Sequence, residues 1–385
     1  MSMLRVGLFL TLFVTGSFAQ STYNHLDLFS VTPANVQPQG TPTLYASSVT
    51  RQIDYRGTDN VIYSFNTYNH GFSWTNLSSL GHAPGAAGDP AMGYTSTPQN
   101  VVAFRGFDNH IYRLAAQNGV WVTTDLTGSS NPLQALADPS LFASSVVQNV
   151  DYAAVGGLEQ IYRYGTSGSW TIANLAPSLC GNAPSVSSAL AITYTSLPEN
   201  IVVYNGLYNS NGQKWDLFAL TAKNGQWTCG FITGSLSGNG SVSPAPNSSP
   251  ALYADANIIL VPYTNGYQAF EVQSFVSGGN PIPVNLSTAS GIGVVITMGN
   301  PSIAYSSSAH YVAVRALLGN QSYDDIIVFS NTGQGWHYEC ATCATNHYPY
   351  AASDVRIALY NGNPVIAYSG VDGHVHLLYK GPSPQ

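Results

Sequence analysis

The feature that most constrains the fold of this chain is an internal repeat. Three separated segments, which begin at Gln52, Val101 and Val365, each contain an alternating apolar run, a Gly-x-Asp-[Asn/Gly] turn and a second alternating run. Alternation with a period of two predicts β-strands, and Asn or Gly at a turn tolerates a positive φ. Each segment is therefore predicted to form a β-hairpin.

Two further strands are expected around each hairpin. A short stretch opened by Pro precedes it, at Pro42, Pro90, Pro139, Pro250 and Pro301. After it comes an aromatic residue followed five positions later by an aliphatic one, at Phe72/Leu77, Trp121/Leu126, Trp170/Leu175 and Trp227/Ile232, and more weakly at Pro281/Leu286 and Trp336/Ala341. Four short antiparallel strands per repeat are typical of the blade of a β-propeller.

The number of repeats predicts how the ring closes. Six complete units run from residue 42 to about 345, and a seventh, Asp354 to Tyr379, has only three strands. The segment Tyr23–Leu28 has the same aromatic-to-aliphatic spacing, so we expect it to supply the missing strand and remove an exposed sheet edge. The prediction is an all-β, seven-bladed propeller with four antiparallel strands per blade, in a single domain over residues 20–385. The fourth unit departs most, with loop insertions expected at Tyr208 to Gln213 and Leu236 to Ser249.

Residues 1–19 have the pattern of a secretory signal peptide. Arg5 supplies a positive charge, Val6 to Val14 is apolar, and Ser17-Phe18-Ala19 forms a small-x-small cleavage signal before Gln20. The apolar stretch is too short for a membrane span, which needs roughly 20 residues. The mature chain is therefore predicted to be secreted and extracellular, with no membrane span.

The composition narrows the classes of partner and activity. Only 8% of the residues are charged, against about 25% in an ordinary domain, and 11 Lys and Arg leave no basic surface for nucleic acid. A glycosidase needs two carboxylates around one bond, and nothing in the sequence nominates a pair. No Gly-x-Ser-x-Gly elbow and no Gly-rich phosphate loop occur. We therefore expect no enzymatic activity and no cofactor.

Four cysteines are expected to form two disulfides in an oxidising compartment. Three connectivities are possible, and we favour Cys180–Cys229 with Cys340–Cys343. His374 and His376 share one face of a strand and could hold a metal with a third ligand, but no third ligand is evident, so no metal site is predicted. Sequons for N-glycosylation begin at Asn76, Asn239, Asn247, Asn285 and Asn320.

The repeats resemble those of β-propeller lectins, in particular the fucose-lectin and tectonin-like group. The resemblance is carried by the Arg56-Gly-Thr-Asp59 and Arg105-Gly-Phe-Asp108 turns, the Ile-Tyr strands after them and the Trp that opens the outer strand. It implies carbohydrate binding by an Arg on the second strand, a Glu on the third and a stacking Trp. That Arg/Glu pair is not retained, because the corresponding positions hold Ile53/Ser64, Val102/Arg113, Leu260/Glu271 and Ile366/Leu377.

Eight residues are candidates for ligand binding on these grounds. They are the outer-strand aromatics with the polar residues expected beside them: Phe72, Trp121, Trp170, Trp227, Trp336, Arg113, Arg163 and Glu271. We expect Arg113 beside Trp121 and Arg163 beside Trp170. The alternative is that the aromatics pack between blades. The Arg-Gly-x-Asp turns are interpreted as local ion pairs, and Asp89-Pro90 and Asp138-Pro139 as strand entries.

The sequence thus favours a secreted, lectin-like protein that binds neutral glycans or glycoconjugates at repeated weak sites between blades. A second hypothesis is a secreted propeller that serves as a protein-interaction or structural module without sugar binding, because a fold does not dictate a function. A hydrolase acting on glycans is the third.

Overall fold

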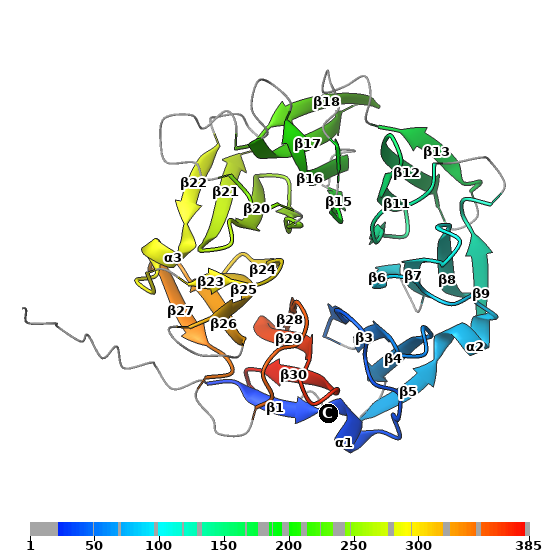
Figure 1. The fold of residues 1–385 in the computed structure, drawn as a ribbon, viewed down its shortest axis with the longest axis horizontal. Coiled ribbons are helices and arrows are strands. Elements are labelled where there is room, and N and C mark those ends of the chain that lie inside the picture. The colour runs from blue at the N-terminus through cyan, green and yellow to red at the C-terminus, as the bar shows by residue number, and fades with distance from the viewer. Residues whose placement is uncertain are drawn as a thin grey trace, which may run out of the picture.

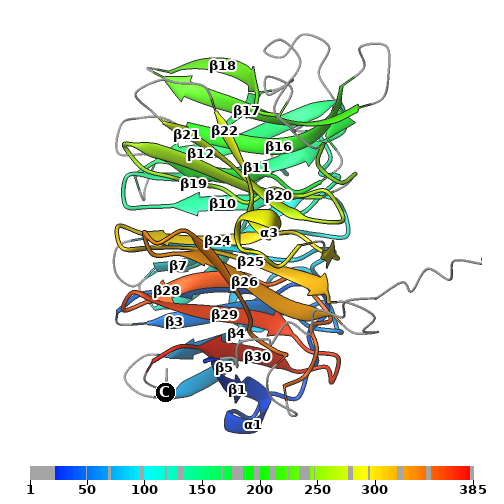
Figure 2. The ribbon, with the colours of Figure 1, turned by 90° about the vertical axis from the view of Figure 1, so that its left-hand side faces the viewer.

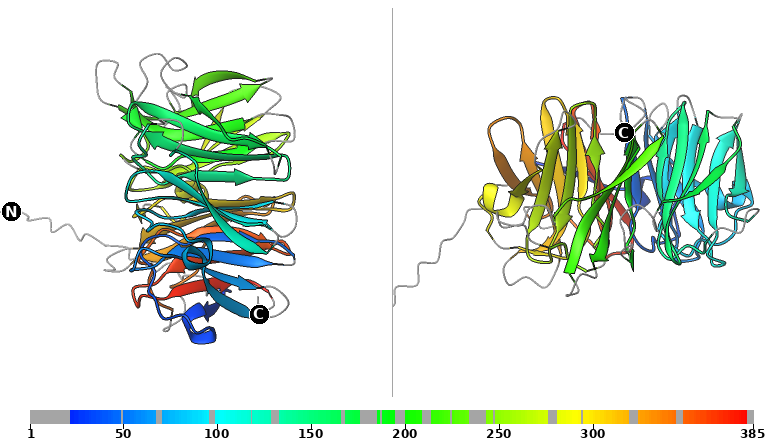
Figure 3. Two further views of the ribbon diagram at one scale, coloured as in Figure 1. Left: turned by 90° about the vertical axis from the view of Figure 1, so that its right-hand side faces the viewer. Right: turned by 90° about the horizontal axis from the view of Figure 1, so that it is seen from above.

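Seven antiparallel β-sheets stand around a central axis in the computed structural model (Figure 1). Seen from the edge, the ring is a disc (Figures 2 and 3). The structure describes residues 22–381, apart from 49, 68–70, 96–98, 118, 129–132, 166–167, 176–184, 187, 195–199, 209–213, 224, 234–242, 247, 276–280, 294, 319–323 and 344–347. The predicted seven-bladed, all-β propeller is confirmed.

The first three blades each contain four strands in sequential order. Blade 1 contains β2 (Thr43–Ala46), β3 (Arg51–Arg56), β4 (Ile62–Thr67) and β5 (Phe72–Asn76). Blade 2 contains β6 (Ala91–Thr95), β7 (Gln99–Arg105), β8 (Ile111–Gln117) and β9 (Val120–Asp125). Blade 3 contains β10 (Ser140–Ala143), β11 (Val147–Ala154), β12 (Gly157–Tyr164) and β13 (Thr171–Asn174).

Blades 4 and 6 add one short strand each to the expected four. Blade 4 contains β14 (Ser185–Val186), β15 (Ala191–Tyr194), β16 (Asn200–Tyr208), β17 (Lys214–Lys223) and β18 (Gln226–Phe231). Blade 5 contains β19 (Tyr253–Ala254), β20 (Ile258–Thr264), β21 (Ala269–Phe275) and β22 (Ile282–Asn285). Blade 6 contains β23 (Ile296–Thr297), β24 (Ser302–Ser306), β25 (Ala309–Leu317), β26 (Asp325–Asn331) and β27 (Trp336–Cys340). The insertions predicted in the fourth unit fall largely on residues outside those described.

Blade 7 closes the ring with strands from both ends of the chain. It contains β28 (Arg356–Tyr360), β29 (Asn363–Ser369), β30 (Val375–Tyr379) and β1 (Asn24–Asp27). The first strand pairs with the last, from Asn24 opposite Tyr379 to Asp27 opposite His376, and the two strands lie side by side in Figure 1. The predicted closure by the N-terminal strand is confirmed. Within the described ranges, no helix is long and apolar enough to cross a membrane.

A separate apolar cluster fills each of the seven gaps between neighbouring blades. The aliphatic residue of each predicted aromatic–aliphatic pair is buried in one of these clusters: Leu28, Leu77, Leu126, Leu175, Ile232, Leu286 and Ala341. Fully burying one of the Leu or Ile side chains contributes about 1.5–3 kcal/mol. The repeated aliphatic position therefore attaches each blade to the next.

A polar cap fixes the backbone just before three of these aliphatic residues. Asp27, Asn76 and Asn285 are the N-caps of α1 (Leu28–Val31), α2 (Leu77–Gly81) and α3 (Leu286–Ala289). Each side chain accepts a hydrogen bond from a backbone N–H of the first helical turn, which satisfies a donor that the turn leaves free. Two predicted sequons, at Asn76 and Asn285, thus have a capping role; Asn239, Asn247 and Asn320 lie outside the described residues.

The Arg-Gly-x-Asp turns differ from the prediction of a local ion pair. Asp59 instead accepts a hydrogen bond from the Tyr63 hydroxyl at 2.7 Å, and Asn60 adopts the left-handed conformation with φ 65°. Arg56 pairs across the gap with Asp89 of blade 2, with 3.8 Å between Nη2 and Oδ1. The extended strand directs the long Arg side chain towards the adjacent blade.

The same interblade pair recurs elsewhere in the ring. Arg105 of blade 2 lies 3.7 Å from Asp138 of blade 3, so its predicted pairing with Asp108 is also wrong. Asp108 accepts instead from the Tyr112 hydroxyl at 2.6 Å. The Asp of each Asp-Pro entry therefore joins blades as well as starting a strand.

The disulfide between Cys340 and Cys343 is confirmed. It closes a short loop at the end of β27. Cys229 is also disulfide-bonded. Cys180 lies outside the described residues, so the Cys180–Cys229 pairing stays a prediction.

Candidate functional site

The centre of the ring holds a cavity of about 550 Å³ that residues from all seven blades line. Its acidic side chains already have partners. Asp89 accepts from the Thr41 backbone N–H at 2.8 Å, and burial raises the pKa of Asp89 to about 6. Asp354 accepts from Asn300 Nδ2 at 2.7 Å.

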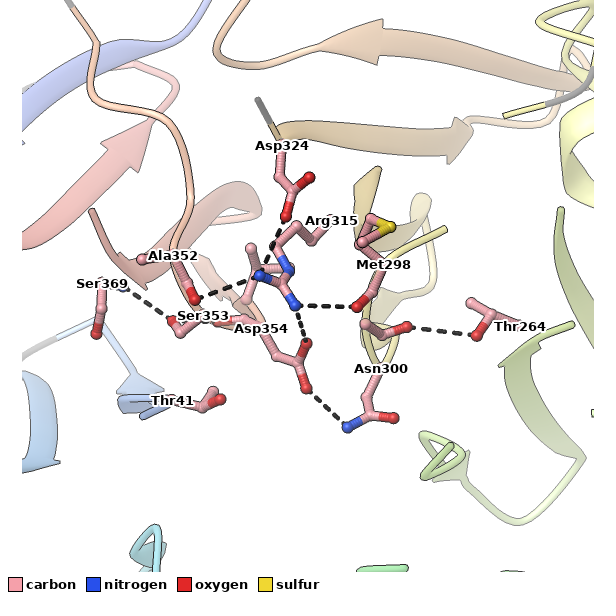
Figure 4. A network of polar contacts seen from close by, with 12 residues as sticks. Thr41, Thr264, Met298, Asn300, Arg315, Asp324, Ala352, Ser353, Asp354 and Ser369 are labelled. Carbon is pink, nitrogen blue, oxygen red and sulfur yellow. Dashed lines mark hydrogen bonds and ion pairs between the residues drawn. The ribbon is translucent and has the colours of Figure 1, made fainter. Parts of the chain in front are cut away.

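Arg315 completes this polar network at blades 6 and 7 (Figure 4). Its guanidinium donates to the carbonyl oxygens of Met298 at 2.9 Å and Ala352 at 3.2 Å, and it pairs with Asp324 at 3.1 Å. The Arg315 guanidinium also lies 4.0 Å from Asp354 of blade 7. Arg56 and Arg105 likewise lie against an Asp of the following blade. The central network therefore connects blades.

The blades are joined in pairs by aromatic contacts on their inner strands. Tyr45 stacks on Tyr94 with ring centroids 4.6 Å apart, and Phe142 stacks on Tyr194 at 5.4 Å. A third contact, between Tyr253 and Tyr305 at 4.6 Å, joins blades 5 and 6. Among the described residues, these aromatic contacts lie in the gaps between blades 1 and 2, 3 and 4, and 5 and 6, in addition to the apolar cluster of each gap.

A cavity of about 430 Å³ lies between blades 1 and 2. Trp121 of β9 lines it together with the polar residues Gln52, Asn66 and Asn100. Asn66 Nδ2 donates to Gln52 Oε1 at 3.0 Å. Asn100 is 4% exposed, and neither of its side-chain polar atoms has a partner among the described residues. An unpartnered buried amide costs stability, so a ligand that satisfies it would bind favourably.

A second cavity, of about 620 Å³, occupies the equivalent gap between blades 3 and 4. Trp227 of β18 lines it, with Asn149, Gln160 and Asn200 as polar neighbours. The side-chain oxygens of Asn149 and Asn200 are buried and find no donor in the described part of the chain. Both cavities therefore combine an aromatic wall with amide groups that can donate and accept.

One buried carboxyl lies beside each cavity. Asp54 accepts from Gln52 Nε2 at 2.8 Å, and burial raises the pKa of Asp54 to about 7. Asp151 accepts from Gln160 Nε2 at 3.0 Å, and burial raises the pKa of Asp151 to about 8. These carboxyls orient the amide side chains that line the two cavities.

Sequence reasoning identified Trp121 and Trp227 but missed the amide residues around them. A signal was present in the repeat of blades 2 and 4. The segments Tyr94–Val102 and Tyr194–Val202 share the pattern Tyr-Thr-Ser-x-Pro-x-Asn-x-Val. The match between alternate blades is closer than the match between neighbours, and it marks Asn100 and Asn200.

The gap between blades 5 and 6 contains two of the predicted site residues, Glu271 and Trp336. Among the described residues, no cavity lined by a Trp and neutral amide groups is found in this gap. Glu271 is fully buried and lies 2.7 Å from Nε2 of His310. The His310 ring contacts Trp336 edge-on, with centroids 4.7 Å apart. Glu271 and Trp336 are thus brought together through His310.

Three other predicted residues meet between blades 2 and 3. The guanidiniums of Arg113 and Arg163 lie 5.7 Å and 4.8 Å from the ring centroid of Trp170. Arg163 is beside Trp170 as expected. The structure places Arg113 against Trp170 as well, because its side chain points across the gap towards blade 3. The remaining candidate, Phe72, packs against the apolar cluster between blades 7 and 1.

The positions assigned from the sequence to the sugar-binding Arg and Glu do not share a gap. Ile53 is buried between blades 7 and 1, whereas Ser64 lines the cavity between blades 1 and 2. Successive residues of a strand point to opposite faces, so the residue beside the cavity is Gln52. Gln52, rather than Ile53, is therefore the residue of this strand that faces the cavity with Ser64.

The His374-x-His376 pair contributes to ring closure. His374 Nδ1 lies 2.9 Å from Asp27 of β1. His376 contacts Asp372 through Nε2 and His25 of β1 through Nδ1, both at 2.9 Å. Both ring nitrogens of His376 are therefore occupied by neighbours.

Comparisons with known proteins show a fold shared with fucose-binding β-propeller lectins, as expected from the repeats. AofleA from Arthrobotrys oligospora matches with a TM-score of 0.52 and 10% identity, over 84% of this chain and 90% of that one. A fucose-specific lectin from Aleuria aurantia matches with a TM-score of 0.51 and 13% identity, over 82% of this chain and 100% of that one. An α-L-arabinanase from Penicillium chrysogenum has a lower TM-score, 0.45, with 11% identity over 94% of this chain and 98% of that one. No family model and no curated protein matches the sequence.

Proposed function

We propose that this chain is a secreted, lectin-like protein that binds neutral glycans between blades 1 and 2 and between blades 3 and 4. The observation that carries the proposal is the pairing, in both cavities, of a Trp with buried amide atoms that have no partner among the described residues. A Trp face suits the C–H groups of a sugar ring, and Asn or Gln can both donate to and accept from its hydroxyls.

The size and charge of the cavities support the same proposal. Volumes of about 430 and 620 Å³ fall within the usual range for small-ligand pockets. Neither cavity has an acidic or basic residue among its described lining residues. Hydrolysis of a glycosidic bond uses two carboxyl groups, so these linings favour binding over catalysis. The lectins that share the fold include one described as fucose-specific, but here the Arg/Glu pair is missing, and we propose neutral glycans as a class.

The test is a neutral glycan array followed by titration calorimetry on Trp121→Ala, Trp227→Ala and the double variant. Each single change should weaken binding at its own cavity about threefold to tenfold, the range of an aromatic contact, and the double change should weaken binding at both cavities by that factor. Trp336→Ala is the matched control, because Trp336 occupies the same strand position in blade 6 but contacts His310. Unchanged binding by the double variant would refute the assignment.

A second variant separates binding from folding. Asn100→Leu removes an amide that has no partner in the described structure, so it should leave the melting temperature unchanged or raise it. The same change should weaken glycan binding between blades 1 and 2. If no glycan binds the wild-type protein at all, the alternative of a protein-interaction or structural module is favoured.

Secretion is proposed from the sequence of residues 1–19. Expression of the full chain in a secreting host should release a protein whose first residue is Gln20. Intact-mass and N-terminal analysis of the medium checks this, and a product that stays in the cell with its N-terminus uncleaved would contradict it.

A further inference from the structure

Two buried arginines face each other between blades 2 and 3. Arg113 of β8 is 1% exposed, and Arg163 of β12 is 7% exposed. Arg113 Nε and Arg163 Nη2 both donate to the same atom, Gln148 Oε1, each at 3.1 Å. Two positive groups therefore share one neutral acceptor.

The pair has no negative partner within the described part of the chain. Burial, and then the nearby charge of Arg163, lower the pKa of Arg113 to about 10. Burial also lowers the pKa of Arg163. No carboxylate opposes either shift. A buried charge is normally paired, so this arrangement lacks its usual compensation.

Several polar atoms of this cluster are also without partners among the described residues: Arg113 Nη2, Arg163 Nε and Gln148 Nε2. All three are N–H donors. Trp170 contacts the two guanidiniums, and a contact with an aromatic ring leaves the N–H groups at a guanidinium edge free to donate. The cluster therefore offers several donors, two positive charges and no acceptor beyond the one already used.

The other deeply placed arginines of the described residues do not share one acceptor with a second arginine. Arg56, Arg105 and Arg315 each pair with an Asp of the following blade. Arg51, between blades 7 and 1, also has two donors without a partner among the described residues, Nε and Nη1, but it lies over the ring of Tyr360 at 4.0 Å and no second arginine affects its pKa. Within the described ranges, two arginines that share one acceptor are therefore found only in the gap between blades 2 and 3.

We propose that Arg113 and Arg163 bind one oxyanion, a carboxylate or a sulfate group, between blades 2 and 3. The group would accept from the free N–H donors of both guanidiniums, and charge-assisted hydrogen bonds of this kind are the strong ones. Trp170 is partly exposed and flanks the pair, so a sugar that carries the anion can rest on its ring. This proposal does not rest on the neutral-glycan function, because the residues and the gap are different.

The test is calorimetric titration of the mature protein with sodium sulfate and with sodium glucuronate, at constant ionic strength maintained with sodium chloride. We expect saturable binding with one site per chain. Arg113→Met and Arg163→Met should each weaken it tenfold or more, the scale of one charge-assisted contact. Arg51→Met is the matched control and should bind like the wild type.

The two titrants distinguish the source of the anion. Tighter binding of glucuronate than of sulfate indicates an acidic sugar, and binding of sulfate alone indicates a free inorganic anion; both outcomes support an oxyanion site. Absence of saturable binding by both titrants overturns the proposal, as does binding that both Met variants retain. If a Met variant fails to fold, Arg113→Lys keeps the charge and should show weakened but measurable binding.

The outcome is separate from that of the neutral-glycan test. Trp121→Ala and Trp227→Ala should leave sulfate binding unchanged, since both residues lie in other gaps. If the wild-type protein binds sulfate but no neutral glycan, only the neutral-glycan proposal fails. If it binds a neutral glycan but no oxyanion, only the oxyanion proposal fails.

Discussion

Replacing Leu28 by Ala tests the closure of the ring most sharply. Leu28 follows β1, is 0% exposed, and packs in one cluster with residues of blade 1 such as Ile53 and of blade 7 such as Leu377. Truncation of a fully buried Leu costs about 2–5 kcal/mol, because both transfer energy and cavity formation contribute. We expect a loss of about 3 kcal/mol, or a decrease of about 4 °C in melting temperature for a domain of this size.

The assay is differential scanning calorimetry at a fixed scan rate, with urea unfolding as a second measurement. Leu126→Ala, in the equivalent position between blades 2 and 3, should cost a similar amount. Leu80→Ala, where the side chain is 51% exposed, should change the melting temperature by less than about 1 °C. If Leu28→Ala behaves like Leu80→Ala, the N-terminal segment does not close the ring and the reasoning is refuted.

Three further predictions concern pH and the disulfide. Burial raises the pKa of Asp151 to about 8, above its unfolded value, so the folded state holds an extra proton and its stability falls as pH rises from about 4 to 8. The melting temperature of Asp151→Asn relative to wild type should therefore increase across that window. Parallel melting profiles of the two proteins would contradict this prediction. Burial, and then the neighbouring His376, lower the pKa of His25 to about 4, so the stability of the fold falls as pH decreases from about 6.5 to 4. The melting temperature of His25→Gln should be less sensitive to acid than that of the wild type in the same calorimetric series. Equal acid sensitivity would show that His25 does not contribute to this pH dependence. Cys340→Ser with Cys343→Ser should lower the free energy of unfolding in urea by about 2 kcal/mol, the loop-closure value for so short a loop, and an unchanged midpoint would show that the bridge does not stabilise the fold.

The architecture was predictable because the repeated residues determine the backbone geometry of the strands and turns and the burial of one aliphatic side chain per blade. Alternating strands, Asn or Gly turns and an aliphatic residue at a fixed spacing are local patterns, and each has one structural consequence. Leu28 could be recognised as the missing member of the series because, like Leu126, it follows an Asp and stands five positions after an aromatic residue.

The site was less predictable because it depends on contacts between blades. Trp121 and Trp227 could be named from their place on the outer strand, but Gln52 was missed because a shift of one residue moves a side chain to the opposite face of a strand. The partners of Arg56 and Arg113 lie in the following blade, at a sequence distance that no local pattern fixes. The residues that meet between blades could be recognised only from the similarity of alternate blades, which appears when every second repeat is compared.

The most direct test of the proposed function is a crystal structure of the mature protein with a neutral oligosaccharide that binds in solution. We expect one sugar ring against Trp121 with its hydroxyls bonded to Asn100, and a second against Trp227 beside Asn200. Sugar found only in the central cavity, or two empty gaps at saturating ligand, would contradict it.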